Sequence, residues 1–468
     1  MTGGNERPAI RAAVIAACAT LALAWPAVPA AAETLAGALA LAYRNNPQLN
    51  AQRAIVRQTD ENVPQALSGY RPRVNATAQV GEQFTWTSVE TAGRRVNTRT
   101  YHQPRSIGAQ VQQTLFNGFQ TANQTRAAES QVSAARETLR VIEQQVLLDA
   151  ATAYMNVLRD TAILEVQRSN VRVLGETLRQ TRDRFNVGEV TRTDVAQAQA
   201  QLAAGQSQLL AAESNLTTSK AVYRRVVCVE AVRLAPGMPV DRLSPRTLAG
   251  AIAEGQAMNP SVTAAMYGVD VAALQVKVSE GALYPVVTLT GNVQRAHELT
   301  SVIDEQFTAS IIAGVTIPIY QGGAEYSNIR QSKELLGQRR LDLATTQDQA
   351  RATVVQAWGQ HEAAKAQIQA AQEQVTASEV ALNGVREEAR VGQRTTLDVL
   401  NAQQALVNAR VNLVTAQRDR VVASYSLLFA VGRLSPQVLR LPTEIYDPMV
   451  HYQQVRDAWG GVRTPDGR

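Results

Sequence analysis

The residues that could do acid–base, nucleophilic or metal chemistry are few in this chain and widely spaced. Four histidines, at positions 102, 297, 361 and 451, and two cysteines, at 18 and 228, are spread over 468 residues. Two cysteines exclude a disulfide scaffold and a cysteine-based metal cluster. The sequence contains no phosphate-binding loop, no nucleophile–base motif and no cluster of metal ligands. It therefore predicts neither catalysis nor a cofactor.

The polar residues with the most regular placement lie in two similar segments, 204 residues apart. Val187-Gly188 precedes Thr193-Asp194 in the first, and Val391-Gly392 precedes Arg394 and Asp398 in the second. Glycine suits the left-handed residue that ends a helix, and threonine suits the N-cap of the next helix. An aspartate in the first helical turn gains about 0.3–1 kcal/mol from the helix dipole. Each segment is predicted to be the tip of a helical hairpin, and Arg394 alone could be a solvated loop charge.

The two segments belong to an internal duplication. Residues 35–47 resemble residues 248–260 at an offset of 213, whereas residues 115–118 resemble residues 319–322 at an offset of 204. The first half therefore carries nine extra residues between Val74 and Leu115. A unit of roughly 200 residues is far longer than a solenoid repeat. The predicted domains are a first repeat at 33–247, a second repeat at 248–432 and a C-terminal equatorial segment or tail at 433–468.

Most of each repeat is predicted to be a long helical hairpin, at about 118–228 and about 322–430. No proline occurs from 105 to 235 or from 319 to 435, and proline costs about 3 kcal/mol inside a helix. Apolar residues recur every seven positions with one four-residue step, which is typical of a coiled coil with a stutter. Only His361 interrupts this seam, and we interpret it as a tolerated polar position rather than a ligand. The first helix of each hairpin would be about 100 Å long.

Two strands are predicted in each repeat, at about 72–115 and about 285–318. Apolar and polar residues alternate along 73–86 (broken at Glu82), along 106–115 and along their counterparts in the second half. This alternation is typical of membrane β-barrel strands, but ordinary half-buried hairpins share it. Phe84 and Trp86 could form an interfacial aromatic belt or simply pack.

The N-terminus has the features of an export signal. Arg7 and Arg11 precede an apolar run at 12–25 and the small residues Ala30-Ala31-Ala32, so residues 1–32 are predicted to be a signal peptide. The alternative is lipoprotein cleavage before Cys18. The net charge of +6 is scattered along the chain, which does not favour a nucleic-acid partner.

Export favours the membrane interpretation of the strands. Four strands cannot close a barrel, and an open sheet edge is not tolerated in lipid. Three chains would pool twelve strands, enough for an aqueous pore, whereas the eight strands of two chains would enclose only side chains. The sequence therefore predicts a homotrimer.

Together these features resemble the TolC family of outer-membrane channel proteins, over residues 35–432. The motifs that carry the resemblance are the duplication, the strand pairs, the junctions Leu115-Phe-Asn-Gly118 and Ile319-Tyr-Gln-Gly322, and the twin Val-Gly tips. The resemblance implies a mixed α and membrane β fold. Its homotrimer forms a 12-stranded barrel in the Gram-negative outer membrane, with four strands per chain, continued by a periplasmic α-helical coiled-coil tunnel.

The resemblance also implies a function. The trimer would be the passive exit duct of a tripartite efflux pump or a type I secretion system. A periplasmic adaptor (membrane fusion) protein and an inner-membrane transporter, of RND or ABC type, would dock at the tunnel tip and open it. The alternative is a periplasmic coiled-coil adaptor or scaffold without a pore, but such proteins lack the duplicated alternating strands.

The same resemblance assigns roles to residues at the tips. Val187, Gly188, Val391 and Gly392 match the adaptor-docking tips. Arg394 matches an arginine that holds the periplasmic gate shut, and Thr193 and Asp194 match its partners on the neighbouring hairpin. Asp398 matches a carboxylate that rings the narrowest point, where three copies would favour cations.

Two positions depart from the family pattern. Ala389 stands where a gating tyrosine is often found, and Asn401 stands where a second acidic ring would lie. We therefore expect a looser or differently latched gate with weaker cation selectivity. The sequence does not identify the cargo.

Overall fold

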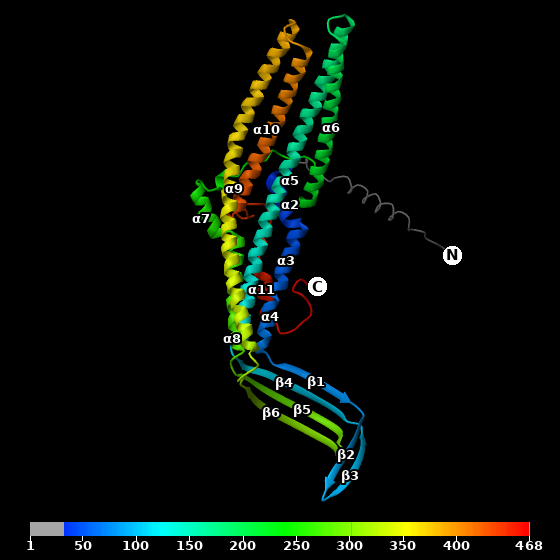
Figure 1. Cartoon of the computed structure of the whole chain (residues 1–468), viewed down its shortest axis with the longest axis vertical. Coiled ribbons are helices and arrows are strands. Elements are labelled where there is room, and N and C mark those ends of the chain that lie inside the picture. The colour runs from blue at the N-terminus through cyan, green and yellow to red at the C-terminus, as the bar shows by residue number, and fades with distance from the viewer. Residues whose placement is uncertain (1–31, 301, 468) are drawn as a thin grey trace, which may run out of the picture.

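The computed structural model describes residues 32–300 and 302–467. The predicted signal peptide (except Ala32) and the alternative cleavage site before Cys18 lie outside these residues. The molecule is elongated, with a β-sheet at one end and two helical hairpin tips at the other (Figure 1). Among the described helices, none has an apolar stretch long enough to cross a bilayer.

Each repeat begins with short helices and continues with strands and a long helical hairpin. The first repeat contains α2 (Leu35–Asn45), α3 (Pro47–Asp60), α4 (Asn62–Leu67), α5 (Gln120–Asn186) and α6 (Arg192–Val227). The second contains α7 (Leu248–Met258), α8 (Pro260–Gly281), α9 (Ala324–Arg390) and α10 (Thr396–Ala430), and α11 (Met449–Val455) follows. The longest helices, α5 and α9, have 67 residues each, so each is about 100 Å long.

The heptad seam is the buried face of the long helices, as its spacing predicts. The first-repeat seam residues Val132, Leu139, Val146 and Val157 are all buried. His361, the polar exception in α9, is only 3 % exposed. Its Nε2 lies 2.9 Å from Oδ1 of Asp241, so this position is a buried polar contact between helix and linker.

Four strands form one antiparallel sheet in the order β1-β4-β5-β6. Their bounds are β1 Arg73–Val80, β4 Arg105–Asn117, β5 Val286–Thr300 and β6 Ile303–Thr316. Two further strands, β2 (Gln83–Thr91) and β3 (Arg94–His102), form a separate hairpin. It bends away from the sheet at the end far from the helices (Figure 1).

The predicted first strand, 73–86, is therefore wrong as a single strand. Pairing of β1 with β4 ends at Val80↔Arg105, and pairing of β2 with β3 begins at Gln83↔His102. Gly81, Glu82, Gln103 and Pro104 lie between the two ladders. Proline has no backbone N–H to donate to a ladder, so strand pairing stops at this point. The alternation of apolar and polar residues continues across it and does not reveal the break.

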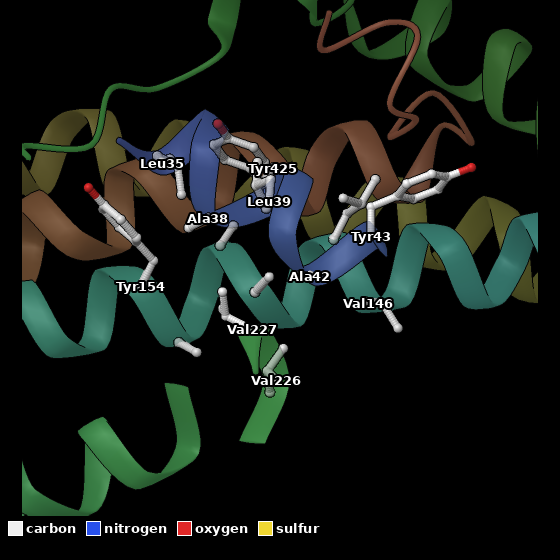
Figure 2. Close-up of a cluster of buried hydrophobic side chains, with 14 of the residues drawn as sticks. Leu35, Ala38, Leu39, Ala42, Tyr43, Val146, Tyr154, Val226, Val227 and Tyr425 are labelled. Carbon is white, nitrogen blue, oxygen red and sulfur yellow. The ribbon is translucent and has the colours of Figure 1, made fainter. Parts of the chain in front are cut away.

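The main core lies near the middle of the helical region. Side chains from α2, α5, α6 and α10 meet there, and Figure 2 shows Leu39, Tyr43, Tyr154, Val227 and Tyr425 among them. The Tyr154 hydroxyl is within hydrogen-bond distance of the backbone oxygens of Glu33, at 2.7 Å, and Ala235, at 2.6 Å. The core therefore joins both long hairpins and the segment between the repeats.

The segment between the repeats is anchored on the second hairpin. Asp241 accepts hydrogen bonds from both terminal nitrogens of Arg420 on α10, and it also contacts His361 on α9. These contacts lower the pKa of Asp241, although burial opposes the shift. Cys228, at the end of α6, is a free, exposed thiol. It caps α6 in the left-handed conformation.

The C-terminal segment docks against the first repeat. His451 of α11 places Nδ1 3.0 Å from Oδ2 of the buried Asp60 on α3. Leu434 and Leu441 pack into the main core. The C-terminal segment is thus anchored on the helices at Leu434, Leu441 and His451.

Candidate functional site at the hairpin tips

Both hairpin tips have the same backbone. Gly188 and Gly392 have φ values of 80° and 78°, in the left-handed region that glycine adopts most easily. The N–H of Gly188 donates to the oxygen of Phe185, and the N–H of Glu189 donates to the oxygen of Arg184. Gly392 and Gln393 make the equivalent bonds to Ala389 and Glu388. This is the Schellman pattern of helix termination.

The next helix begins with a capping box in both tips. The Thr191 hydroxyl accepts from Asp194 N at 3.3 Å, and Thr191 N donates to Asp194 Oδ2 at 2.9 Å. Thr395 and Asp398 repeat this arrangement at 3.3 and 3.0 Å. Such a box satisfies backbone N–H groups that the helix start leaves unpaired. Thr193 is not the cap; it is exposed in the first turn of α6.

Each tip carries one ion pair across the turn, but with the charges reversed. In the first tip, Arg184 Nε lies 3.0 Å from Glu189 Oε2. In the second, Arg394 Nε lies 2.8 Å from Glu388 Oε2. Arg184 and Glu388 occupy equivalent positions, 204 residues apart. The arginine thus lies before the glycine in the first tip and after it in the second.

The aspartates of both tips hold their charge strongly. The pKa of Asp194 is lowered by hydrogen bonds from the Thr191 hydroxyl and backbone. The pKa of Asp398 is lowered by bonds from the Thr395 backbone and hydroxyl, and the Arg394 charge adds to the effect. Donors to a carboxylate stabilise its charged form. Two fixed negative charges therefore lie at the tips at neutral pH.

An apolar cluster behind the tips connects the two hairpins. Leu400 of α10 packs with Leu174 and Leu178 of α5 and with Ala198 of α6. One polar contact lies nearby, because Gln201 Nε2 donates to Gln404 Oε1 at 3.1 Å. The first hairpin and α10 are thus joined shortly after the second helix of each hairpin begins.

The predicted site residues gather at the two tips, but the latch partners do not meet within one chain. Arg394 pairs with Glu388 of its own hairpin, while Asp194 caps α6. The side chains of Val187 and Val391 are 72 % and 71 % exposed. No group of three or more His, Cys, Asp or Glu residues in the described ranges is arranged to hold a metal ion.

Comparisons with known proteins match nearly the whole chain. The sequence model of the family described as "Outer membrane efflux protein" matches residues 38–225 and 251–433. The outer membrane efflux protein BepC of Brucella suis is 42 % identical over 440 residues, which cover 94 % of each chain. The outer membrane protein TolC of Vibrio cholerae is 29 % identical and covers 87 % of this chain and 92 % of its own.

A solved structure shows the same fold at low sequence identity. The CmeC outer membrane channel of Campylobacter jejuni aligns with a TM-score of 0.76 and 17 % identity, covering 90 % of this chain and 89 % of that one. The observed structure has the features of the expected fold class: one sheet of four strands per chain, long helical hairpins and an internal duplication. The expected fold class is therefore confirmed.

Proposed function

Because the chain belongs to the outer membrane efflux protein family, we propose that its hairpin tips form a gate that an adaptor protein opens. The protein itself is an outer-membrane channel with a periplasmic helical tunnel, and it serves as an exit duct for efflux or secretion. The family consists of channel proteins rather than enzymes. The proposal concerns the residues that close the duct and the partners that open it.

The observation that carries the gate assignment is the position of Arg394. Its guanidinium is half exposed at the tip and has a single ion-pair partner, Glu388, among the described residues. An arginine has five N–H donors, so donors remain for carboxylates on a neighbouring hairpin. Asp194 has two oxygens, and the capping box uses only Oδ2. In a trimer, Arg394 would bridge Glu388 and Asp194, with Thr193 beside it, and so hold the tips together.

Asp398 is proposed to form a ring of three carboxylates at the constriction. It lies four residues after Arg394 and one helical turn from the tip. In the single chain, bonds from the Thr395 backbone and hydroxyl lower the pKa of Asp398, and this favours the charged form against the mutual repulsion of three carboxylates, which raises the pKa. Such a ring favours cations. The neutral Asn401 stands where a second ring would lie, so the preference is weaker than two rings would give.

The exposed Val-Gly turns are proposed as the adaptor-docking surface. Val187 and Val391 project from glycine turns whose backbone is fixed by Schellman bonds. An exposed valine on a rigid turn offers an apolar contact at a low entropic cost. The adaptor and an inner-membrane transporter of RND or ABC type would use this surface, and the cargo would be small molecules or secreted proteins.

The gate assignment can be tested by conductance in a planar bilayer. The mature protein, purified in detergent, is expected to give small, discrete, cation-preferring steps. Arg394→Ala is expected to enlarge them severalfold, because the bridge between hairpins is lost. Arg179→Ala is the matched control, since Arg179 also forms an exposed ion pair, to Glu176, but lies within α5. Equal conductance of all three proteins would refute the gate, and silence from a confirmed trimer would favour a scaffold without a pore.

The docking surface can be tested in the native host. Val187→Asp and Val391→Asp are expected to raise ethidium accumulation, because a buried charge at the adaptor contact is costly. Val462→Asp, at a fully exposed valine of the C-terminal segment, is the control and should leave accumulation unchanged. Unchanged accumulation in all variants, at equal outer-membrane levels, would overturn the docking assignment.

A further inference from the structure

The hairpin of β2 and β3, residues 83–102, carries positive charge without partners; we call it the arginine hairpin. Arg94, Arg95 and Arg99 stand against one acidic residue, Glu90. All three arginines are exposed, and none is within ion-pair distance of a carboxylate in the described chain. Glu90 is opposite Arg95 in the ladder, yet the two side chains form no ion pair. The charge is therefore available to an external partner.

The corresponding end of the second repeat is different. There β5 and β6 close directly, at Thr300↔Ile303. Arg295 Nε donates to Glu305 Oε1 at 2.6 Å, and Arg105 lies 3.7 Å from Glu298. The positive charges near that turn are thus neutralised internally. The unpaired arginines lie within the segment that is longer in the first repeat, between Val74 and Leu115.

One face of the arginine hairpin has an ordered arrangement of side chains. Because side chains alternate along a strand, the pairs Phe84↔Tyr101, Trp86↔Arg99 and Glu90↔Arg95 share a face. The three aromatic side chains are 63–65 % exposed and lie nearest the four-stranded sheet. Arg95 lies toward the turn, about 20 Å along the strands from Phe84 and Tyr101 and about 13 Å from Trp86. On this face Arg99 thus lies beside the aromatic residues and Arg95 lies nearer the turn, opposite Glu90, while Arg94 lies on the other face.

Exposed aromatic rings beside unpaired arginines fit the surface of a phosphorylated membrane. Amphipathic aromatic rings lie at membrane interfaces, and arginine binds phosphate oxygens through parallel N–H donors. We propose that the arginine hairpin binds the phosphate groups of the glycolipid in the outer leaflet. The proposal rests on the outer-membrane orientation, in which the sheet end far from the helices faces outward. The duct itself does not require this contact.

The test measures binding of lipid A by the purified trimer in detergent. Bis-phosphorylated lipid A is expected to bind at least tenfold more tightly to the wild-type protein than to the triple variant Arg94→Gln/Arg95→Gln/Arg99→Gln. Dephosphorylated lipid A should not distinguish the two proteins. Raising the salt concentration should weaken only the wild-type interaction, because exposed charges are screened.

The matched control removes three arginines from the helices instead. Arg172, Arg340 and Arg351 are exposed and, like the hairpin arginines, have no ion pair in the described chain. Arg172→Gln/Arg340→Gln/Arg351→Gln should bind lipid A as the wild type does. Equal binding by all three proteins, or equal loss in both variants, would overturn the proposal. Bilayer conductance should be unchanged in the hairpin variant, so a failure of this proposal is distinguishable from a failure of the gate.

Discussion

The two hairpin tips share a backbone and differ in their charges. Each ends its first helix in a Schellman bond at glycine and begins its second with a Thr–Asp capping box. The ion pair, in contrast, is Arg184–Glu189 in one tip and Glu388–Arg394 in the other. Glycine, threonine and aspartate thus fix the backbone of both turns by ending one helix and capping the next. The arginine has no such backbone role, so its position differs between the two tips. A functional difference between the two tips is therefore expected to depend on the position of this arginine.

Reversing the ion pair of the second tip should have the largest effect. Glu388→Arg with Arg394→Glu keeps a pair across the turn but moves the positive charge to the place it has in the first tip. If Arg394 must reach Asp194 of a neighbouring hairpin, this variant will conduct as Arg394→Ala does, severalfold more than the wild type. The matched reversal, Arg184→Glu with Glu189→Arg, should leave conductance unchanged. A closed channel in the first variant would mean that the local pair alone suffices.

Neutralising Asp398 should have the next largest effect. Asp398→Asn should abolish most of the cation preference, measured as the reversal potential in a KCl gradient, whereas Asp194→Asn should change it less. Capping bonds lower the pKa of Asp398 in the single chain, whereas the other two carboxylates of the ring would raise it, so the wild-type preference should fall as the pH drops through the pKa of the assembled ring. The charged carboxylate also stabilises the tip above its unfolded pKa, and this stabilisation is lost as the pH falls through the lowered value. A cation preference that Asp398→Asn leaves unchanged would exclude Asp398 as its source.

Removing the caps should have a smaller and equal effect in both tips. Thr191→Ala and Thr395→Ala each remove an N-cap, which costs about 1 kcal/mol. Amide exchange in the first turn of α6 or α10 should accelerate about fivefold, because local opening becomes easier by that free energy. A much larger change for Thr395→Ala than for Thr191→Ala would show that Thr395 has a further role in the second tip.

Removing the first-tip arginine should have the smallest effect. The Arg184 and Glu189 side chains are about half exposed, and such surface pairs contribute about 0–1 kcal/mol. Arg184→Ala should therefore leave conductance unchanged and accelerate amide exchange at the tip by less than the roughly fivefold expected for removal of a cap. An open channel in this variant would mean that both tips latch the gate.

The backbone conformation of the tips can be predicted from the sequence, but the ion-pair partners of their charged side chains cannot. Gly188 and Gly392 could be assigned as helix ends because few residues adopt their conformation easily. The partner of Arg394 could not, because a flexible side chain can reach several carboxylates and the heptad pattern does not constrain it. Comparing Arg184 with Glu388 at the offset of 204 would have revealed the reversal.

The segments between the regular elements are also hard to predict, because no periodic pattern constrains their contacts. The fold follows from periodicity and duplication, but Asp241 lies in a stretch without periodicity, and only its contacts with Arg420 and His361 give it a role. The separate hairpin of β2 and β3 was also missed, because alternation alone does not reveal where the pairing partner of a strand changes.

The anchoring of Asp241 on Arg420 has a mechanical consequence. It gives α10 a fixed point along its length, and the part of the helix from Thr396 to Arg420 is then a lever arm of about 36 Å. A rotation of about 10° around that point would move the tip by about 6 Å, as the arm length requires. This is twice the length of the Arg394–Glu388 contact, 2.8 Å. If the second hairpin moved as a unit and the Leu400 cluster released, a small angular change at the middle of the molecule would thus be enough to separate Arg394 from a carboxylate of a neighbouring hairpin, while Glu388 would move with Arg394.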